Sequence, residues 1–310
     1  MKRVLDWLVP VGDAAPGFFH VPGQDKGKYP HSHAMLIMAG EEGNEGIMFD
    51  CGVGNRVARK LAKEVSISKV YFSHWHEDHA LSWHVIKKAT RYCHVNDIPA
   101  LSSIDTLLDR YAVKGTGLES PFTTYMQGIG FEPVDGLHAF KDGTRIDLHD
   151  GRHVDVIHAP GHAAGHCCFL EPESGVAYLG DIDLTCFGPW YGARDCSLED
   201  FLDSIERLSR LPIAHALTGH ARVYHGAEVR DALERYAGAI EAREQRLLHL
   251  LSEKVPRTVQ DLAGNSVVYK QYGAFESYLL LAEGIMIEHH LRLLEKKGRV
   301  RRDGDGHVLA

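Results

Sequence analysis

Residues 73–79 constrain the fold more than any other segment of the chain. They read Ser-His-Trp-His-Glu-Asp-His and directly follow an apolar run typical of a β-strand. The four potential ligands His74, His76, Asp78 and His79 cannot all face one ion. A tight loop at a strand's C-terminal end can turn His74 and His76 toward one metal ion and Asp78 and His79 toward a second. Nitrogen and carboxylate ligands of this kind suit Zn²⁺, Mn²⁺ or Fe²⁺.

Three later segments repeat the same arrangement of a polar residue behind a strand. They are Pro160-Gly161-His162, Leu179-Gly180-Asp181 and Thr218-Gly219-His220. In each segment the glycine lets the backbone approach a packed site closely. Histidine is the commonest side-chain metal ligand near neutral pH, and this chain of 310 residues has 21 scattered histidines. The sequence therefore predicts one metal site assembled from the ends of several strands.

The order of the predicted elements indicates an α/β protein with two similar halves. Apolar runs at 34–38 and 46–50 predict two strands joined by a polar turn at 41–45, and 54–64 has helical spacing. The Asp150-Gly151 pair predicts a hairpin turn, and Ser197 a helix cap. The glycine-containing segment 113–133 is expected to form a long loop. Two mixed sheets covered by helices would form an αββα sandwich.

The complete series of motifs resembles the metallo-β-lactamase superfamily, specifically its HxHxDH hydrolases such as the hydroxyacylglutathione hydrolases. The resemblance spans about residues 30–225. It implies that Asp50 supports the ligand loop and that Asp78 and Asp181 are catalytic carboxylates. It also implies a metal-bridging hydroxide as the nucleophile, with zinc as the expected metal and iron or manganese as alternatives. The implied ligands are His74, His76 and His162 for one ion, Asp78, His79 and His220 for the other, and Asp181 as the bridge between them.

Other polar residues near these motifs have more than one interpretation. Tyr191 lies in an aromatic segment soon after Asp181, where it would either donate a hydrogen bond to an oxyanion or simply pack. His33 would contact substrate or cap the following strand. His166, four residues after His162, is expected to lie behind the ligands as a hydrogen-bond donor rather than to bind metal itself.

Near residue 230 the alternation of strands and helices gives way to long helical segments. This change predicts a hydrolase domain at 1–230 and a small winged-helix-like domain at 231–310. Three helical segments precede a hairpin around residues 303–306. The pattern at 290–300 (HLRLLEKKGRV) is similar to the winged-helix tail of β-lactamase-like hydrolases, some of which are endoribonucleases. Its long helix at 275–297 is more apolar than a three-helix unit can hide, which favours packing on another domain or a homodimer.

Composition narrows the compartment and the substrate. The net charge of -8 argues against binding of nucleic acid through the overall charge of the protein. Residues 1–17 do not read as a signal peptide, no apolar run is long enough to span a membrane, and the six cysteines include no CxxC pair, so a cytoplasmic protein is expected. The favoured function is hydrolysis of a small ester, thioester or lactone.

Two alternatives remain open at this stage. A metal-dependent endoribonuclease or phosphodiesterase would hold RNA through the basic residues Lys296, Lys297, Arg299, Arg301 and Arg302. A non-enzymatic protein would keep the C-terminal segment as a nucleic-acid or partner module beside an inactive metal domain. The complete ligand set argues against that second alternative.

Overall fold

A computed structural model describes residues 7–13, 15–40 and 45–310. Residues 1–6 of the N-terminal segment and residues 41–44 of the predicted turn lie outside this description. Within the described ranges, no helix is long and apolar enough to cross a membrane. All six cysteines are free, and five of them are buried.

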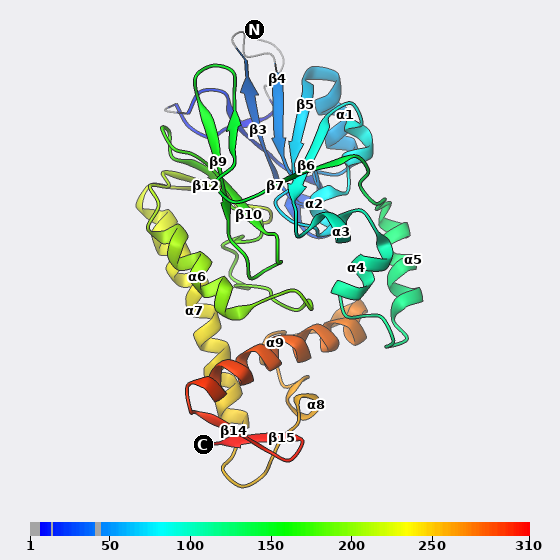
Figure 1. Cartoon of the computed structure of the whole chain (residues 1–310), viewed down its shortest axis with the longest axis vertical. Helices are drawn as coiled ribbons and strands as arrows, with labels where there is room; N and C mark the ends of the chain where they lie inside the picture. The colour runs from blue at the N-terminus through cyan, green and yellow to red at the C-terminus, as the bar shows by residue number, and fades with distance from the viewer. Residues whose placement is uncertain (1–6, 14, 41–44) are drawn as a thin grey trace.

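Two β-sheets lie side by side in the upper part of the molecule in Figure 1. The first sheet has, in spatial order, the strands β1 (Val9–Pro10), β2 (Phe18–Val21), β3 (Ala34–Ala39), β4 (Glu45–Phe49), β5 (Ser66–Tyr71), β6 (Thr90–His94) and β7 (Leu137–Phe140). The second has β13 (Tyr224–His225), β12 (His215–Leu217), β11 (Val176–Tyr178), β10 (Cys167–Glu171), β9 (His153–His158) and β8 (Arg145–Asp147). Strands β4 to β7 run parallel, as do β11 and β12.

Alternation along the strands explains why the sheets stack. In β3, Met35 and Ile37 belong to the core between the two sheets, where they join residues such as Phe169 and Val176 of the second sheet. Leu36, between them in sequence, faces the opposite side and joins a second core under the helices. Both faces of the sheet are therefore buried, and the αββα sandwich predicted from the sequence is confirmed.

Helices cover the two outer faces. On the first sheet's side lie α1 (Asn55–Glu64), α2 (Glu77–Ala80), η2 (Trp83–Ile86), α3 (Ile98–Leu101), α4 (Ile104–Arg110) and α5 (Glu119–Ile129), whereas α6 (Leu198–Ser209) and α7 (Ala227–Leu250) cover the second sheet. A further 3-10 turn, η1 (Gln24–Gly27), follows β2. Ser197 caps α6 as predicted, because its side chain accepts a hydrogen bond from the Asp200 N–H.

The expectation of an unstructured loop at 113–133 is wrong, because α5 occupies residues 119–129. Phe122 and Met126, four residues apart, give this helix an inward face, and Met126 is buried. The glycines that suggested a loop mostly lie outside it: Gly130 ends the helix in the left-handed conformation.

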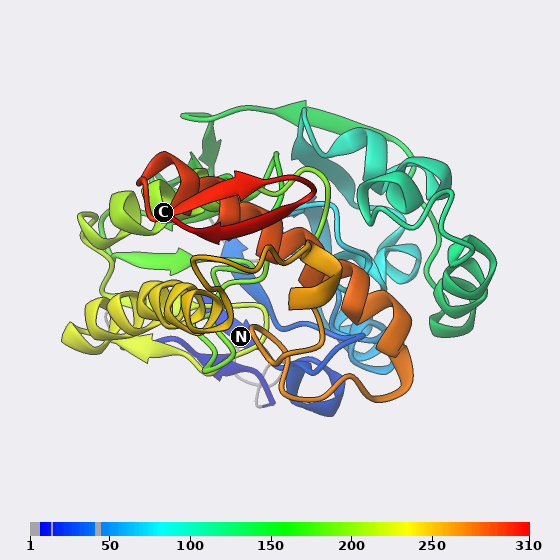
Figure 2. The same cartoon turned by 90° about the horizontal axis from the view of Figure 1, so that it is seen from below.

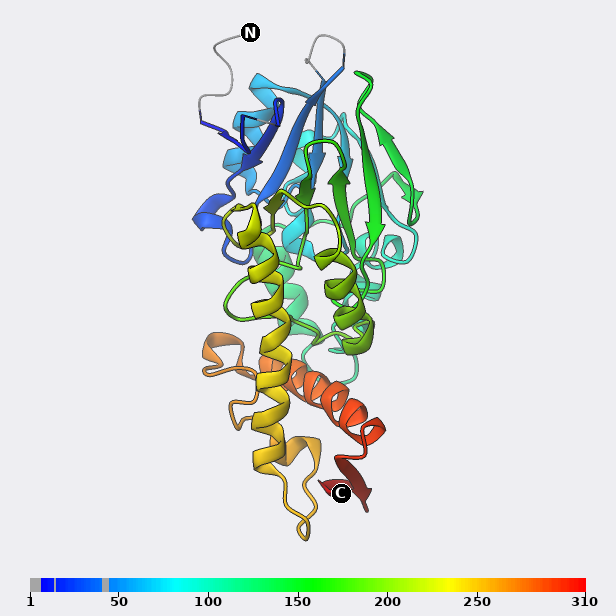
Figure 3. The same ribbon diagram turned by 90° about the vertical axis from the view of Figure 1, so that its left-hand side faces the viewer.

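The C-terminal unit has the predicted order of helices followed by a hairpin. After α7 come α8 (Val259–Leu262), η3 (Gly273–Phe275), α9 (Glu276–Lys296), β14 (Val300–Asp303) and β15 (Gly306–Leu309). Helix α7 runs unbroken past position 230 as a long rod (Figure 3), and α9 crosses beneath the sheets (Figures 1 and 2). Side chains of α7 and α9 belong to the same apolar core as α6. The C-terminal unit is thus packed firmly against the sandwich.

Candidate metal centre

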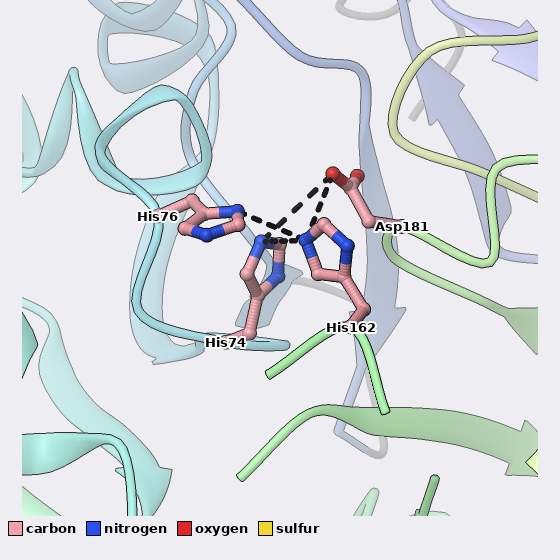
Figure 4. A group of neighbouring side chains, drawn as sticks. All are labelled: His74, His76, His162 and Asp181. Atoms are coloured by element: carbon pink, nitrogen blue, oxygen red, sulfur yellow. Dashed lines mark hydrogen bonds and ion pairs between the residues drawn. The ribbon is translucent and has the colours of Figure 1, made fainter. Parts of the chain in front are cut away.

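The seven predicted metal ligands meet where strands of both sheets end. The ligand loop follows β5, His162 follows β9, Asp181 follows β11 and His220 follows β12. Two clusters form, and in each the ligand atoms all lie within 4.8 Å of one another. One contains His74, His76, His162 and Asp181 (Figure 4), and the other contains Asp78, His79 and His220.

In the first cluster three imidazole nitrogens converge. Nε2 of His162 lies 3.2 Å from Nε2 of His74 and 2.9 Å from Nδ1 of His76. Asp181 completes the group, with Oδ2 at 3.3 Å from the same His162 nitrogen. Two nitrogens bound to one zinc ion at about 2.0–2.1 Å in tetrahedral geometry would be roughly 3.3 Å apart. The spacing of the donors therefore fits a single metal ion.

Hydrogen bonds fix which nitrogen of two of these rings carries the proton. Nδ1 of His162 donates to the Trp190 carbonyl at 2.9 Å. Nδ1 of His74 donates to Ser73 Oγ at 2.9 Å, because that hydroxyl gives its own proton to Asp50 at 2.6 Å. The Nε2 atoms of both rings thus point bare lone pairs at each other. A bound cation is what such an arrangement satisfies.

In the second cluster the histidine Nδ1 atoms are again used as donors, and the Nε2 atoms face carboxylates. Nδ1 of His79 donates to Asp50 and Nδ1 of His220 to the Gly27 carbonyl, each at 2.6 Å. The Nε2 atom of His79 then faces Asp181 Oδ1 at 2.8 Å, and that of His220 faces Asp78 Oδ2 at 3.2 Å. Lone pairs and carboxylate oxygens at these distances repel one another unless a positive charge lies between them.

The pKa values of the clustered histidines also favour a bound cation. Burial holds the pKa values of His74, His76 and His162 below the usual range, so these rings are neutral and ready to bind metal. Burial also opposes charge on His220, but Asp181 and Asp78 outweigh it and raise the pKa of His220 to about 9. The carboxylates at this position thus favour a cation, whether a proton or a metal ion.

Two buried residues hold the ligands in place. Asp50, which has a positive φ of 61°, accepts hydrogen bonds at Oδ2 from Ser73, His79 and the Tyr178 hydroxyl. Nε2 of His166 accepts the Asp181 N–H at 3.1 Å, and its Nδ1 donates to the Ala159 carbonyl. Both residues lie behind the ligands as expected, and neither is in a ligand cluster. His166 differs from the expectation in that it accepts a hydrogen bond from Asp181 instead of donating one.

Comparison with known proteins agrees with this geometry. Residues 30–220 match the metallo-beta-lactamase superfamily. The chain belongs to this superfamily. It is 24% identical to an atrochrysone carboxyl ACP thioesterase of Pseudocercospora fijiensis, over 96% of this chain and 80% of the relative. It is 27% identical to the hydroxyacylglutathione hydrolase of Erythrobacter litoralis, over 60% of this chain and 64% of the relative.

The fold extends over nearly the whole length of a solved relative. A metallo-beta-lactamase family protein from Thermus thermophilus superposes with a TM-score of 0.70 at 23% identity, covering 95% of this chain and 99% of the other. Together with the ligand clusters, these relatives establish a metal-dependent hydrolase of the metallo-β-lactamase superfamily. The alternative of a protein without enzymatic activity is set aside.

A cavity of about 550 Å³ opens beside the metal ligands of this hydrolase. Its lining includes the site residues His76, Asp78, His162, Asp181 and His220. The sandwich contributes the aromatic residues Tyr29, Tyr111, Phe122, Tyr125, Phe187 and Trp190. The C-terminal unit contributes Tyr269, Phe275, Tyr278 and Leu279. Most of this wall gives no signal in the sequence, because the residues that form it are scattered between positions 29 and 279 and follow no motif.

Tyr191 does not lie in this cavity, so the structure does not support its predicted contact with an oxyanion. The side chain is fully buried, and its hydroxyl hydrogen-bonds to His290 at 2.7 Å and to Arg243 at 3.1 Å. The packing interpretation of this residue is the one that fits. The neighbouring Trp190 enters the cavity instead. His33 is also buried by packing, and its Nδ1 accepts the Gly23 N–H at 3.0 Å.

Proposed function

We propose that this hydrolase binds two divalent ions and cleaves acyl thioesters. His74, His76 and His162 would hold one ion, Asp78, His79 and His220 the other, with Asp181 shared between them. The observation that supports this most is the convergence of bare imidazole lone pairs and carboxylate oxygens described above. Zinc suits the mixed nitrogen and oxygen donors, and iron or manganese are the alternatives.

Bound as a pair, such ions lower the pKa of a shared water and polarise the carbonyl oxygen of a substrate. The chain's own residues supply the remaining functions. Asp181 has Oδ1 and Oδ2 directed at different clusters, so its carboxylate is placed to orient the attacking water and to take its proton. His166 holds the Asp181 backbone, which keeps this carboxylate aimed at both clusters.

The charge of the cavity supports an acyl substrate over a phosphodiester. Apart from the histidines, Lys28 is the only basic residue among those that line it, whereas four carboxylates do so. A polyanionic backbone needs several cations along its path. Three of the five C-terminal basic residues are also engaged: Lys296 pairs with Glu199 at 2.7 Å, Lys297 with Glu244 at 3.0 Å, and Arg301 with Asp303 at 3.6 Å.

The names of the relatives favour a thioester among the acyl substrates. An ACP thioesterase and a hydroxyacylglutathione hydrolase both release an acyl group from a thiol carrier. A thiol has a pKa near 8.5. The thiolate is therefore a good leaving group, and it departs without a strong general acid.

The apolar face of α9, which suggested a homodimer, is largely covered within the chain. Ile287, Leu291 and Leu294 are buried, and Ala282 packs closely against Gly192. Because this face is already covered, the structure no longer favours a dimer over a monomer. Sedimentation velocity of the full chain measures the difference directly.

The test is a metal and substrate panel on the full chain purified without chelator. Elemental analysis should give about two ions per chain, and reconstitution with Zn²⁺, Mn²⁺ or Fe²⁺ should restore hydrolysis of S-acyl thioesters. Single-stranded RNA and bis(p-nitrophenyl) phosphate serve as competing substrates. Metal content below one ion after reconstitution, or phosphodiester cleavage that exceeds thioester cleavage, would overturn the proposal.

A further inference from the structure

The cavity beside the metal ligands is far larger than a small acyl group requires. Cavities that bind drug-sized ligands enclose about 300–1,000 Å³, and this one encloses about 550 Å³. An acetyl or lactoyl group would leave most of the aromatic wall in contact with water. That wall would gain free energy from a larger apolar group.

Three of the five tyrosines in the wall already use their hydroxyls inside the protein. The Tyr29 and Tyr111 hydroxyls donate to the two carboxylate oxygens of Glu77, at 2.6 and 2.7 Å. The Tyr269 hydroxyl accepts the Trp190 Nε1–H at 2.7 Å. What these residues have left to offer a ligand is chiefly ring surface. Polar carrier groups with amides would lose hydrogen bonds against such surface.

Rings from both parts of the chain meet around the cavity. Phe122 of α5 lies with its ring centroid 5.0 Å from that of Tyr278 of α9, in a T-shaped arrangement. Tyr125 packs edge-on to Phe275 at 4.7 Å. Offset and edge-on aromatic pairs of this type are favourable, and a planar ligand can extend them.

Two buried charges of the C-terminal helices hold the wall in place. Glu283 of α9 is fully buried and accepts the N–H groups of Gly264, Val268 and Tyr269, at 2.9, 2.8 and 3.3 Å. Arg243 of α7, equally buried, donates to the carbonyls of Pro189 and Phe187. The loops that carry Tyr269 and Trp190 are therefore fixed by charge-assisted hydrogen bonds rather than left free.

From these observations we infer that the hydrolase selects substrates with a bulky, planar, apolar acyl group, such as a two-ring aryl group. The C-terminal unit supplies the part of the cavity that recognises this group. The inference rests on the proposed thioesterase function. Water attacks the thioester carbonyl carbon, the carbon–sulfur bond breaks, and the products are the aryl carboxylic acid and the free thiol.

The first experiment varies the acyl group on one thiol. With the metal-loaded enzyme, kcat/KM is measured for the acetyl, hexanoyl, benzoyl and 2-naphthoyl thioesters of N-acetylcysteamine. We expect a rise of about 100-fold from acetyl to 2-naphthoyl, which reflects burial of apolar area. Equal kcat/KM values across the series would overturn the inference while leaving the thioesterase function intact. Hydrolysis of none of these thioesters would instead reject the proposed function.

A second series keeps the naphthoyl group and varies the thiol among N-acetylcysteamine, glutathione and coenzyme A. We expect kcat/KM to change by less than about tenfold across it, because the thiol lies outside the aromatic wall. A larger effect of the thiol than of the acyl group would show that the cavity receives the leaving group, contrary to the inference.

Two pairs of variants locate the specificity. Leu279→Trp narrows the cavity, and we expect it to lower the naphthoyl-to-acetyl ratio of kcat/KM by about tenfold or more. Ser277→Trp, at an exposed position of the same helix, is its control. Phe275→Ala should lower the ratio about threefold or more, compared with Val255→Ala as control, since both side chains are at least 44% exposed. The ratio is independent of the folded fraction. An unchanged ratio in both test variants would contradict the assigned wall.

Discussion

The candidate metal ligands and the aromatic wall lie at one cavity. They differ in the parts of the chain that supply them and in the contacts that hold their side chains in place. Every candidate ligand comes from the sandwich and follows a strand. Three of the seven, His79, His220 and His162, are held by hydrogen bonds to Asp50, Gly27 and Trp190. The wall is shared between the sandwich and the C-terminal unit, and two of its rings, Tyr29 and Phe275, are exposed at 49% and 44%. The proposed function therefore assigns the chemistry to the fold common to the superfamily and the choice of substrate to the aromatic wall.

Asp181→Ala should produce the largest effect, because it removes a carboxylate of the first cluster whose Oδ1 also lies 2.8 Å from His79 and 3.4 Å from His220 of the second. We expect kcat/KM to fall by about 1,000-fold or more and metal content to fall below two ions per chain, while the fold persists. Turnover, elemental analysis and circular dichroism measure the three quantities. Asp203→Ala, at an exposed position of α6, is the control. Activity of Asp181→Ala within tenfold of the parent would contradict the assigned role.

The sequence predicts these two regions unequally well. The convergence of the seven candidate ligands was predictable, because each sits in a short motif at a strand end and the topology brings these ends to one edge of the sheets. The close approach of the backbone to the site also follows from the glycines, because a side chain at Gly219 would collide with His79 and Asp181. The cavity wall was not predictable, because Phe122 and Tyr278 become neighbours only through the tertiary packing of α5 and α9.

The C-terminal unit shows the same limit. Its helices and hairpin follow from local periodicity and turn residues, and they were predicted correctly. Helix α7 begins at Ala227 and passes position 230 without a break, so a domain boundary there has no local marker. Glu283 gave no signal either, since a glutamate in a helix is ordinarily a solvated residue, and only the folded loop at 264–272 surrounds it with donors.

Glu283→Gln should therefore weaken the C-terminal wall more than the metal centre. A glutamine has one acceptor oxygen in place of two, so at least one of the N–H groups now bound loses its partner. We expect the free energy of unfolding to fall by about 1–3 kcal/mol and the naphthoyl preference to shrink, with metal content unchanged. Glu288→Gln, at an exposed position of α9, is the control. Loss of metal from Glu283→Gln would show that the two regions are not separable.

Acid should also loosen the C-terminal unit through His290. Burial first, and the Arg243 charge next, lower the pKa of His290 to about 3, and its Nε2 accepts the Tyr191 hydroxyl. The folded state keeps this ring neutral, whereas the unfolded chain protonates near pH 6.5, so stability is full above that pH and falls as pH drops toward 3. The expected slope is about 1.4 kcal/mol per pH unit for one proton. Denaturant unfolding between pH 7 and 5 measures it, and His290→Gln should remove that part of the slope, unlike His138→Gln at an exposed position.

Tyr278→Phe should have the smallest effect, and it tests whether the wall is apolar throughout. The Tyr278 hydroxyl is buried and has no hydrogen-bond partner among the described residues, while the ring packs on Phe122 and Tyr111. Removing an unsatisfied buried hydroxyl is close to neutral or slightly stabilising, so we expect a change of unfolding free energy within about 0.5 kcal/mol of zero or a small gain. The kcat/KM for the 2-naphthoyl thioester should stay within twofold of the parent. Tyr111→Phe is the comparison, because its hydroxyl donates to Glu77 and its removal should cost stability. A tenfold fall in kcat/KM for Tyr278→Phe alone would mean that this hydroxyl contacts the substrate, so that the wall selects a polar substituent on the acyl group as well as its shape.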